Sequence, residues 1–301
     1  MKCKKCKQKS VVSGLCKEHF VKSFERRFYD CIEKYELIQK KDKVLVAVSG
    51  GKDSIVLLYL LSQKYKVKAL AIDEGIRGYR EHTLKVLKDF CEKHSIELTG
   101  RSLKGEFGYT LDQIIRKTKL RPCTVCGILR RYLLNKDRSC DVIATGHNLD
   151  DEAQSIMMNI FKNQVELLAR LGPKTGVIPK KIAKKHFIQR IKPMYFIPER
   201  EIMAYAVLKR FGVPFTECPY AYDSFRASIL EQLNFLENKN PGTKMNIVKN
   251  FLAILPKLKE EFKSGRVGQC SRCSEPANQD LCSACQMADK IKKLLKPRKT
   301  L

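Results

Sequence analysis

The chain has 301 residues, a formal net charge of +27 and an apolar fraction of 44%. This length leaves room for one sizeable catalytic domain with small appendages, and the apolar fraction is that of a globular protein. No window approaches the roughly 20 apolar residues of a membrane helix, and the first residues lack the apolar run of a signal peptide. We therefore expect a cytoplasmic protein without a membrane partner.

The positive charge favours a polyanionic partner. Lys and Arg contacts release the counterions condensed on phosphates, so nucleic acid is the natural candidate. The alternative is a Lys-rich surface that only keeps the protein soluble.

Buried strands alternate with helices through the first half of the chain. The run Val44 to Val48 is continuously apolar, as in a strand buried on both faces. By the same criteria we expect strands at 44–48, 67–72, 96–103 and 141–145, and helices at 54–62, 79–94, 109–117 and 149–161. Strands separated by helices predict an α/β fold with a parallel sheet and right-handed crossovers.

From about residue 165 the pattern changes to helices and basic loops. The expected helices lie at 200–211, 224–237 and 246–255, and the segment 174–192 is rich in Lys.

Cysteines gather at both ends of the chain. The first group reads C-x2-C-x9-C-x2-H, and the second reads C-x2-C-x8-C-x2-C. In a reducing cytosol such spacings indicate metal ligands rather than disulfides. Two facing knuckles complete a zinc tetrahedron, and filled sites of this kind are structural. The predicted zinc ligands are Cys3, Cys6, Cys16 and His19 at one end, and Cys270, Cys273, Cys282 and Cys285 at the other.

A glycine-rich loop follows the first strand. Its residues are Ser49, Gly50, Gly51, Lys52, Asp53 and Ser54. Glycines allow a tight turn whose N–H groups, with those of the helix start, point at phosphate oxygens. The string is not a Walker A loop, which needs an earlier glycine. It resembles the PP-loop of ATP pyrophosphatases, which implies ATP binding, cleavage between the α and β phosphates and adenylation of the substrate.

Two later strand ends should meet this loop at the carboxyl edge of the sheet. Ala71, Ile72 and Asp73 end the second strand, where a nucleotide base would lie, and Gly146 and His147 follow a later strand. Next come Asp150 and Asp151, which can hold Mg²⁺ or orient the reacting group. The alternative is that both are helix-start acids with a structural role.

Six cysteines remain outside the terminal groups. Cys31, Cys91 and Cys140 stand alone and are expected to be small buried hydrophobic residues. Cys123 and Cys126 form a CxxC pair, and Cys218 is available as a third thiolate. Three thiolates suit a [4Fe-4S] cluster with one open iron, since fully ligated clusters use four. A redox-active pair and a cysteine persulfide that carries sulfur remain alternatives.

These features in this order resemble the TtuA branch of tRNA 2-thiouridine synthetases, which includes archaeal NcsA-type and eukaryotic thiolases. The central part is also similar to the TtcA 2-thiocytidine enzymes. The resemblance implies ATP at the loop, tRNA as substrate, and a [4Fe-4S] cluster on the three remaining cysteines. Some TtuA-type enzymes have a catalytic Lys one turn beyond the second cluster cysteine, where this chain has Arg130. Arg keeps the positive charge for an oxyanion but does not readily exchange a proton, so Lys52 is the other candidate, with Asp53 beside it.

We therefore expect four parts: a zinc ribbon at 1–24, a PP-loop core at 25–165, a helical, basic tRNA-binding part at 166–262, and a second zinc ribbon at 263–301. The expected function is ATP-dependent thiolation of a tRNA uridine, at either the wobble or the T-loop position. The sulfur donor is sulfide or a ubiquitin-like thiocarboxylate protein, and relatives indicate a homodimer. The rivals are 2-thiocytidine synthesis, a PP-loop ligase that uses nitrogen, and a zinc protein that only binds RNA.

Overall fold

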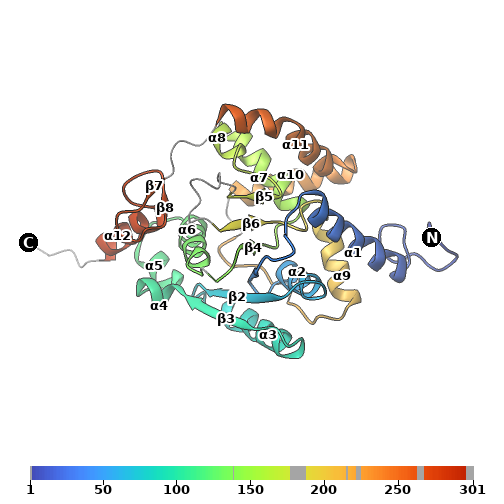
Figure 1. Cartoon of the computed structure of the whole chain (residues 1–301), viewed down its shortest axis with the longest axis horizontal. Helices are drawn as coiled ribbons and strands as arrows, with labels where there is room; N and C mark the ends of the chain where they lie inside the picture. The colour runs from blue at the N-terminus through green and yellow to red at the C-terminus, as the bar shows by residue number, and fades with distance from the viewer. Residues whose placement is uncertain are drawn as a thin grey trace, which may run out of the picture.

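The computed structural model of the chain describes residues 2–137, 139–176, 188–214, 216–221, 225–262 and 268–295. A six-stranded sheet lies at its centre, with helices on both faces (Figure 1). The strand order is β3-β2-β1-β4-β6-β5, and the neighbours run parallel except for β5 and β6. The strands are β1 (Val44–Val48), β2 (Val67–Asp73), β3 (Leu98–Ser102), β4 (Val142–Ala144), β5 (Lys174–Thr175) and β6 (Gln189–Ile191). The predicted α/β fold on a mostly parallel sheet is confirmed.

The helices divide between the two faces because side chains alternate along each strand. Val44, Val46 and Val48 pack with α1, α2, α7 and α9, whereas Leu45 packs with α5, α6 and α12. The helix bounds are α1 (Lys17–Lys34), α2 (Lys52–Ser62), α3 (Arg80–Lys93), α4 (Leu103–Phe107), α5 (Leu111–Lys117), α6 (Pro122–Asn135), α7 (Leu149–Phe161), α8 (Val165–Leu168), α9 (Glu199–Leu208), α10 (Phe225–Lys239), α11 (Thr243–Glu261) and α12 (Ser283–Leu295). Within the described residues, no helix combines the length and apolar character needed to cross a membrane.

The sheet extends further than the sequence analysis expected. After residue 165 only helices and loops were predicted, yet β6 pairs in parallel with β4, and β5 closes that edge. Gln189, Arg190 and Ile191 form β6 without an apolar run, so its pairing partner and not its own composition makes it a strand. Of the basic segment 174–192, residues 177–187 lie outside the described residues.

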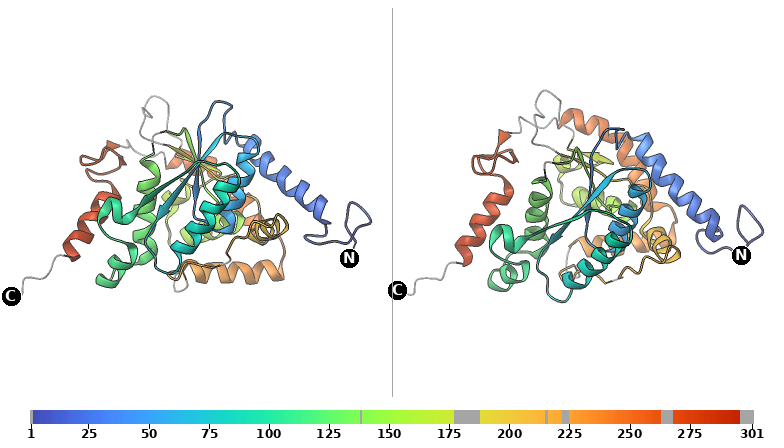
Figure 2. Two further views of the ribbon diagram at one scale, coloured as in Figure 1. Left: turned by 90° about the horizontal axis from the view of Figure 1, so that it is seen from below. Right: turned by 60° about the horizontal axis from the view of Figure 1, so that its bottom comes forward.

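The two cysteine-rich segments lie at opposite ends of the molecule (Figure 2). The first runs directly into α1, whose Phe20, Phe24 and Phe28 are fully buried in the core. The second contains the small hairpin of β7 (Gly268–Gln269) and β8 (Pro276–Ala277) and is followed by α12, which packs on α5 and α6.

Candidate active site

The glycine-rich loop connects the carboxyl end of β1 to α2. Gly50 has φ +82°, and a Cβ at this residue would lie 2.1 Å from the carbonyl oxygen of Thr83. The Ser54 hydroxyl accepts from the N–H of Ser49 at 3.1 Å and donates to the Gly51 carbonyl at 2.9 Å. Gly51 caps α2 without a side-chain hydrogen bond, so within the described residues the first N–H groups of α2 have no capping side chain. This is the geometry of an anion-binding turn.

Two carboxylates surround the amino group of Lys52 beside the loop. Its Nζ lies 3.1 Å from Oδ2 of Asp53 and 2.5 Å from Oε1 of Glu199 on α9. Burial opposes the charge, but the two carboxylates outweigh it and raise the pKa of Lys52. The other oxygen of Asp53 accepts from Nδ2 of Asn148 at 3.1 Å. The lysine is therefore charged, and its amino group lies beside the glycine-rich loop.

The neighbouring strand ends meet the loop as predicted from a parallel sheet. Ala71 pairs with Val48 across β2 and β1, and Ile72 and Asp73 end β2, where Oδ1 of Asp73 accepts from Gly75 N–H at 2.8 Å. On the other side, a Cβ at Gly146 would come within 3.2–3.3 Å of Asp53 and Ser54. The loop is thus enclosed between β2 and the turn after β4.

His147 lies next in that turn with an exposed side chain. Its Nδ1 is 2.9 Å from Oγ1 of Thr145, and among the described residues no hydrogen-bond partner lies at the second ring nitrogen. This position agrees with an edge-of-sheet role, and the assignment to nucleotide binding stays a prediction.

Asp150 and Asp151 lie in the first turn of α7, and all four of their carboxylate oxygens have partners. Asp150 binds the buried Lys244 of α11 through Oδ1 and the N–H of Glu199 through Oδ2 at 2.7 Å. Asp151 accepts from the N–H of Asn148 at 3.2 Å in a capping box and pairs with Arg226 at 2.6 Å. The geometry therefore favours the helix-start alternative, and Mg²⁺ at either residue would have to displace a cation.

The CxxC pair lies at the start of α6, on the same side of the molecule as the ends of β1 and β2. Cys123 is exposed, and its Sγ donates to the carbonyl of Tyr220 at 3.5 Å. The hydroxyl of Tyr220 in turn donates to Asp112 of α5 at 2.8 Å, which fixes the segment 216–221 that carries Cys218. Burial raises the pKa of Cys126 to about 11, and the charges of Cys218 and Cys123 act in the same direction, so the three sulfurs share one neighbourhood.

The donor set of this trio fits a cluster better than a single ion. Among the described residues, only the two terminal groups bring three or more ligand atoms within 4.8 Å of one another. A four-iron cluster is wider than one ion and is held by thiolates, and an exposed Cys123 leaves the trio open to solvent. Arg130 lies one turn beyond Cys126 on α6, with Nη1 3.8 Å from Glu74.

Both terminal groups have the arrangement of tetrahedral metal sites. In the first, Nδ1 of His19 lies 3.3 Å from Sγ of Cys16 and 3.6 Å from Sγ of Cys3. In the second, Sγ of Cys273 lies 3.6 Å from Sγ of Cys282. Such close approach of thiols and an imidazole matches the ligand spacing around Zn²⁺.

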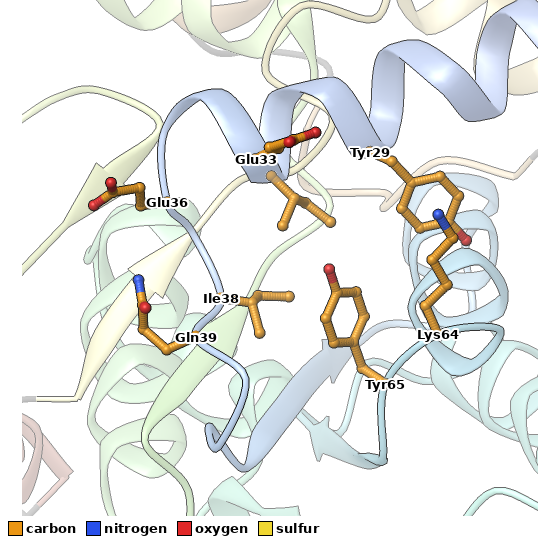
Figure 3. A pocket seen from close by; sticks show the side chains of 8 residues that line it. Tyr29, Glu33, Glu36, Ile38, Gln39, Lys64 and Tyr65 are labelled. Atoms are coloured by element: carbon orange, nitrogen blue, oxygen red, sulfur yellow. The ribbon is translucent and has the colours of Figure 1, made fainter.

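A separate pocket of about 360 Å³ lies away from these residues (Figure 3). It is lined by side chains of α1, of the segment before β1, and of Lys64 and Tyr65 after α2. These residues border the amino ends of β1 and β2, the opposite edge from the glycine-rich loop. The pocket is therefore not part of the candidate active site.

The sequence analysis missed several charged residues of the site. Arg80 and Glu74 form a buried ion pair between the loop and α6. Arg80 lies in a segment whose charges look solvated in the sequence, so only the folded structure identifies it as buried. Lys244, the partner of Asp150, is equally hidden in an otherwise ordinary helix.

Comparisons with known proteins agree with this geometry. A family model described as a PP-loop domain matches residues 20–218. The chain is 38% identical to the tRNA-5-methyluridine(54) 2-sulfurtransferase of Pyrococcus horikoshii, over 95% of the chain and 93% of that protein. It is 31% identical to the tRNA 2-thiolation protein NcsA of Haloferax volcanii, over 97% of the chain and 99% of that protein.

A solved structure is also similar over nearly the whole chain. The U34-tRNA thiolase NcsA from Methanococcus maripaludis, described with its [4Fe-4S] cluster, superimposes with a TM-score of 0.80. It shares 33% identity, and the match covers 96% of each chain. The chain belongs to the PP-loop family and, within it, to the TtuA and NcsA group of tRNA 2-thiolation proteins.

Proposed function

We propose that the chain is a cytoplasmic, ATP-dependent tRNA thiolase that replaces the C2 oxygen of a uridine with sulfur. The observation that carries the proposal is the position of two sites on one side of the sheet. The glycine-rich loop follows β1, and the three-cysteine site, with two of its cysteines at the start of α6, lies near the end of β2, with Glu74 between Arg80 and Arg130. A nitrogen-transferring PP-loop ligase has no use for the three cysteines, and a protein that only binds RNA has no use for the loop.

The glycine-rich loop would bind the ATP that converts the C2 oxygen of the uridine into a leaving group. A uridine must first be turned out of its stack so that its C2 carbonyl reaches the bound ATP. The carbonyl oxygen attacks the α phosphorus, and the bond to pyrophosphate breaks. Lys52 and the N–H groups at the start of α2 stabilise the departing pyrophosphate, with Lys52 exchanging Glu199 for the phosphates. When bound to those phosphates, Mg²⁺ would share their charge. Asp53, the carboxylate of the loop, holds Lys52 in position.

The three cysteines complete the reaction. Cys123, Cys126 and Cys218 would hold a [4Fe-4S] cluster, which with three protein ligands keeps one iron free to bind exogenous sulfur. Sulfide forms the bond to C2, the bond from C2 to oxygen breaks, and AMP leaves with that oxygen. Arg130, one turn beyond Cys126, would stabilise the negative charge that develops on the oxygen and phosphate rather than move a proton.

The two terminal cysteine groups are assigned to zinc binding, and the ribbons that they form are assigned to tRNA binding. We propose one Zn²⁺ on Cys3, Cys6, Cys16 and His19, and one on Cys270, Cys273, Cys282 and Cys285. We divide the chain into zinc ribbons at 1–24 and 263–301, a PP-loop core at 25–165 and a tRNA-binding part at 166–262. Because the ribbons lie at opposite ends of the molecule, tRNA would span the side between them (Figure 2). Sulfide or a ubiquitin-like thiocarboxylate protein would supply the sulfur, and a homodimer remains part of the proposal.

An anaerobic assay tests the function. The protein reconstituted with iron and sulfide receives ATP, Mg²⁺, sulfide and unmodified tRNA, and the digested nucleosides are analysed by mass spectrometry. We expect 2-thiouridine that requires both ATP and the cluster, at a position that sequencing of the digest identifies. A 2-thiocytidine product would support the TtcA-type rival.

Variants separate the roles of the cysteines. Cys126→Ala should abolish thiolation with tRNA affinity unchanged, and Cys31→Ala, a buried lone cysteine, is the matched control. Equal loss of thiolation and tRNA affinity in Cys126→Ala would instead make the trio a structural element. Absence of AMP formation in the wild-type protein would refute the role of the loop.

A further inference from the structure

A buried ion pair lies between the nucleotide loop and the cysteine site. The Nε atom of Arg80 is 2.7 Å from Oε2 of Glu74, and the two side chains are 4% and 8% exposed. Removing one partner from a buried pair leaves an uncompensated charge, so each of these two side chains depends on the other. Arg80 begins α3, and Glu74 directly follows β2.

The remaining donors of Arg80 connect the ends of two strands. Nη1 donates to the Ser49 carbonyl at 2.6 Å, and Nη2 donates to the Ile72 carbonyl at 2.6 Å. Nη1 also donates to Oγ1 of Thr83, whose own carbonyl lies against Gly50. One planar guanidinium thus fixes the first residue of the loop, the end of β2 and the helix turn that presses on Gly50. A lysine has a single nitrogen and cannot make these divergent bonds together.

The second oxygen of Glu74 faces the cysteine site. Its Oε1 lies 3.8 Å from Nη1 of Arg130, which is half exposed on α6, one turn beyond Cys126. The guanidinium of Arg80 holds the carboxylate from the buried side, and Arg130 approaches it from the open side. The carboxylate of Glu74 therefore contacts the buried Arg80 and, on its other side, Arg130, which faces the space between the loop and the cysteines.

We propose that Arg80 and Glu74 are positioning residues for the thiolation reaction: Arg80 sets the geometry of the nucleotide loop, and Glu74 holds Arg130 beside the cysteines. This inference rests on the proposed function, because it assigns the two sites to one reaction. It predicts different effects for the two residues. Changes at Arg80 weaken ATP binding, and changes at Glu74 slow the step that uses Arg130.

Conservative variants in the full-length, reconstituted protein test both parts. Arg80→Lys keeps the charge but loses the divergent bonds, and we expect the Kd for ATP to rise by about tenfold or more, with iron content and tRNA affinity unchanged. Glu74→Asp keeps a charge for Arg80 and withdraws the carboxylate from Arg130. Arg130→Gln removes the exposed partner. Lys88→Gln, in an exposed pair with Glu92 on α3, is the control.

The decisive comparison is a double-mutant cycle. Arg130→Gln should lower kcat for thiolation by about tenfold or more with the Kd for ATP within twofold of wild type. In that background Glu74→Asp should lower kcat no further, because the contact it alters is already gone. Equal effects of Glu74→Asp in both backgrounds would overturn the link to Arg130.

A separate outcome would contradict the proposed role of Arg80. An Arg80→Lys protein that melts earlier but binds ATP like the wild type at a temperature where it is folded would reduce Arg80 to a purely structural residue. If the wild-type protein does not thiolate tRNA, the proposed function fails. The Kd for ATP then still decides the role of Arg80, and the rate of AMP formation replaces thiolation in the cycle.

Discussion

The amino group of Lys52 lies 2.5 Å from Oε1 of Glu199, a residue of α9 far away in the chain. A carboxylate thus holds the amino group of the lysine that we propose as the phosphate ligand. Glu199 is itself fixed, because its backbone N–H donates to Asp150 at 2.7 Å. The start of α7 therefore helps to orient the lysine without touching it.

Replacing this lysine should mainly affect ATP. Lys52→Met removes charge-assisted bonds to phosphate, each of which contributes about 1.5–3 kcal/mol, so we expect the Kd for ATP to rise about 10- to 150-fold. Equilibrium binding of ATP in the absence of tRNA measures this directly. Lys68→Met, in an exposed pair with Glu97, is the control and should bind ATP normally. An unchanged Kd for Lys52→Met would remove Lys52 from the phosphate site.

Two glycines with nearly the same φ angle allow a matched test of the loop. Gly50 has φ +82° and Gly108 has φ +81°, but a Cβ at Gly108 meets nothing within 4 Å. Both Ala variants carry the left-handed backbone cost of about 1–2 kcal/mol, and only Gly50→Ala also collides with the Thr83 carbonyl. We expect similar backbone strain in the two proteins and loss of ATP binding in Gly50→Ala alone. Normal ATP affinity in Gly50→Ala would mean that the tight turn is dispensable.

Metal content should fall in steps. Elemental analysis of the purified protein should find two zinc ions, and either Cys6→Ala or Cys273→Ala should lower the content to about one. Cys91→Ala is the control, because this buried cysteine stands outside both groups. Loss of structure should follow loss of metal at each end, since binding free energy is folding free energy in such segments. Full zinc content in Cys273→Ala would contradict the second site.

A buried ion pair between α7 and the residue after β6 should dominate the stability effects of charge changes. Lys192 and Glu152 lie 2.7 Å apart, with side chains only 10% and 1% exposed. Glu152→Gln leaves the lysine charge buried and uncompensated, which should cost about 3–5 kcal/mol of unfolding free energy. Glu97→Gln breaks an exposed pair with Lys68 and should cost less than about 1 kcal/mol. Urea unfolding of the two variants under identical metal loading compares them, and equal losses would refute the argument from burial.

The sequence predicted those helices, strands and ligand groups that are determined by residues close together in the chain. The strand Val44–Val48 and the helix Leu149–Phe161 have the expected bounds, because the strand is apolar throughout and the helix begins at an Asn that caps it. The terminal ligand groups were also predicted, since CxxC knuckles are set by short-range spacing. Helix α1 was not predicted, although Phe20, Phe24 and Phe28 recur every four residues and form its buried face.

What the sequence could not predict depends on tertiary contacts. Strand β6 exists because β4 offers it an edge, and its own residues have no strand pattern. The partners of Asp150 lie on α9 and α11, 49 and 94 residues away in the sequence. Only the folded chain could therefore show whether Asp150 is free to bind a metal or is a helix-start acid with partners of its own. Arg80 was hidden for the same reason, since burial of a single charge within a polar helix has no signature in sequence.

The central claim is that ATP activates the base carbonyl, so the oxygen lost from the base must leave on AMP. We would prepare tRNA with a heavy isotope of oxygen at C2 of the target uridine and run one turnover with ATP and sulfide under anaerobic conditions. Mass spectrometry of the nucleotide product then follows the label. The account predicts that the heavy oxygen appears in AMP in an amount equal to the 2-thiouridine formed. Thiolated tRNA accompanied by unlabelled AMP would contradict it.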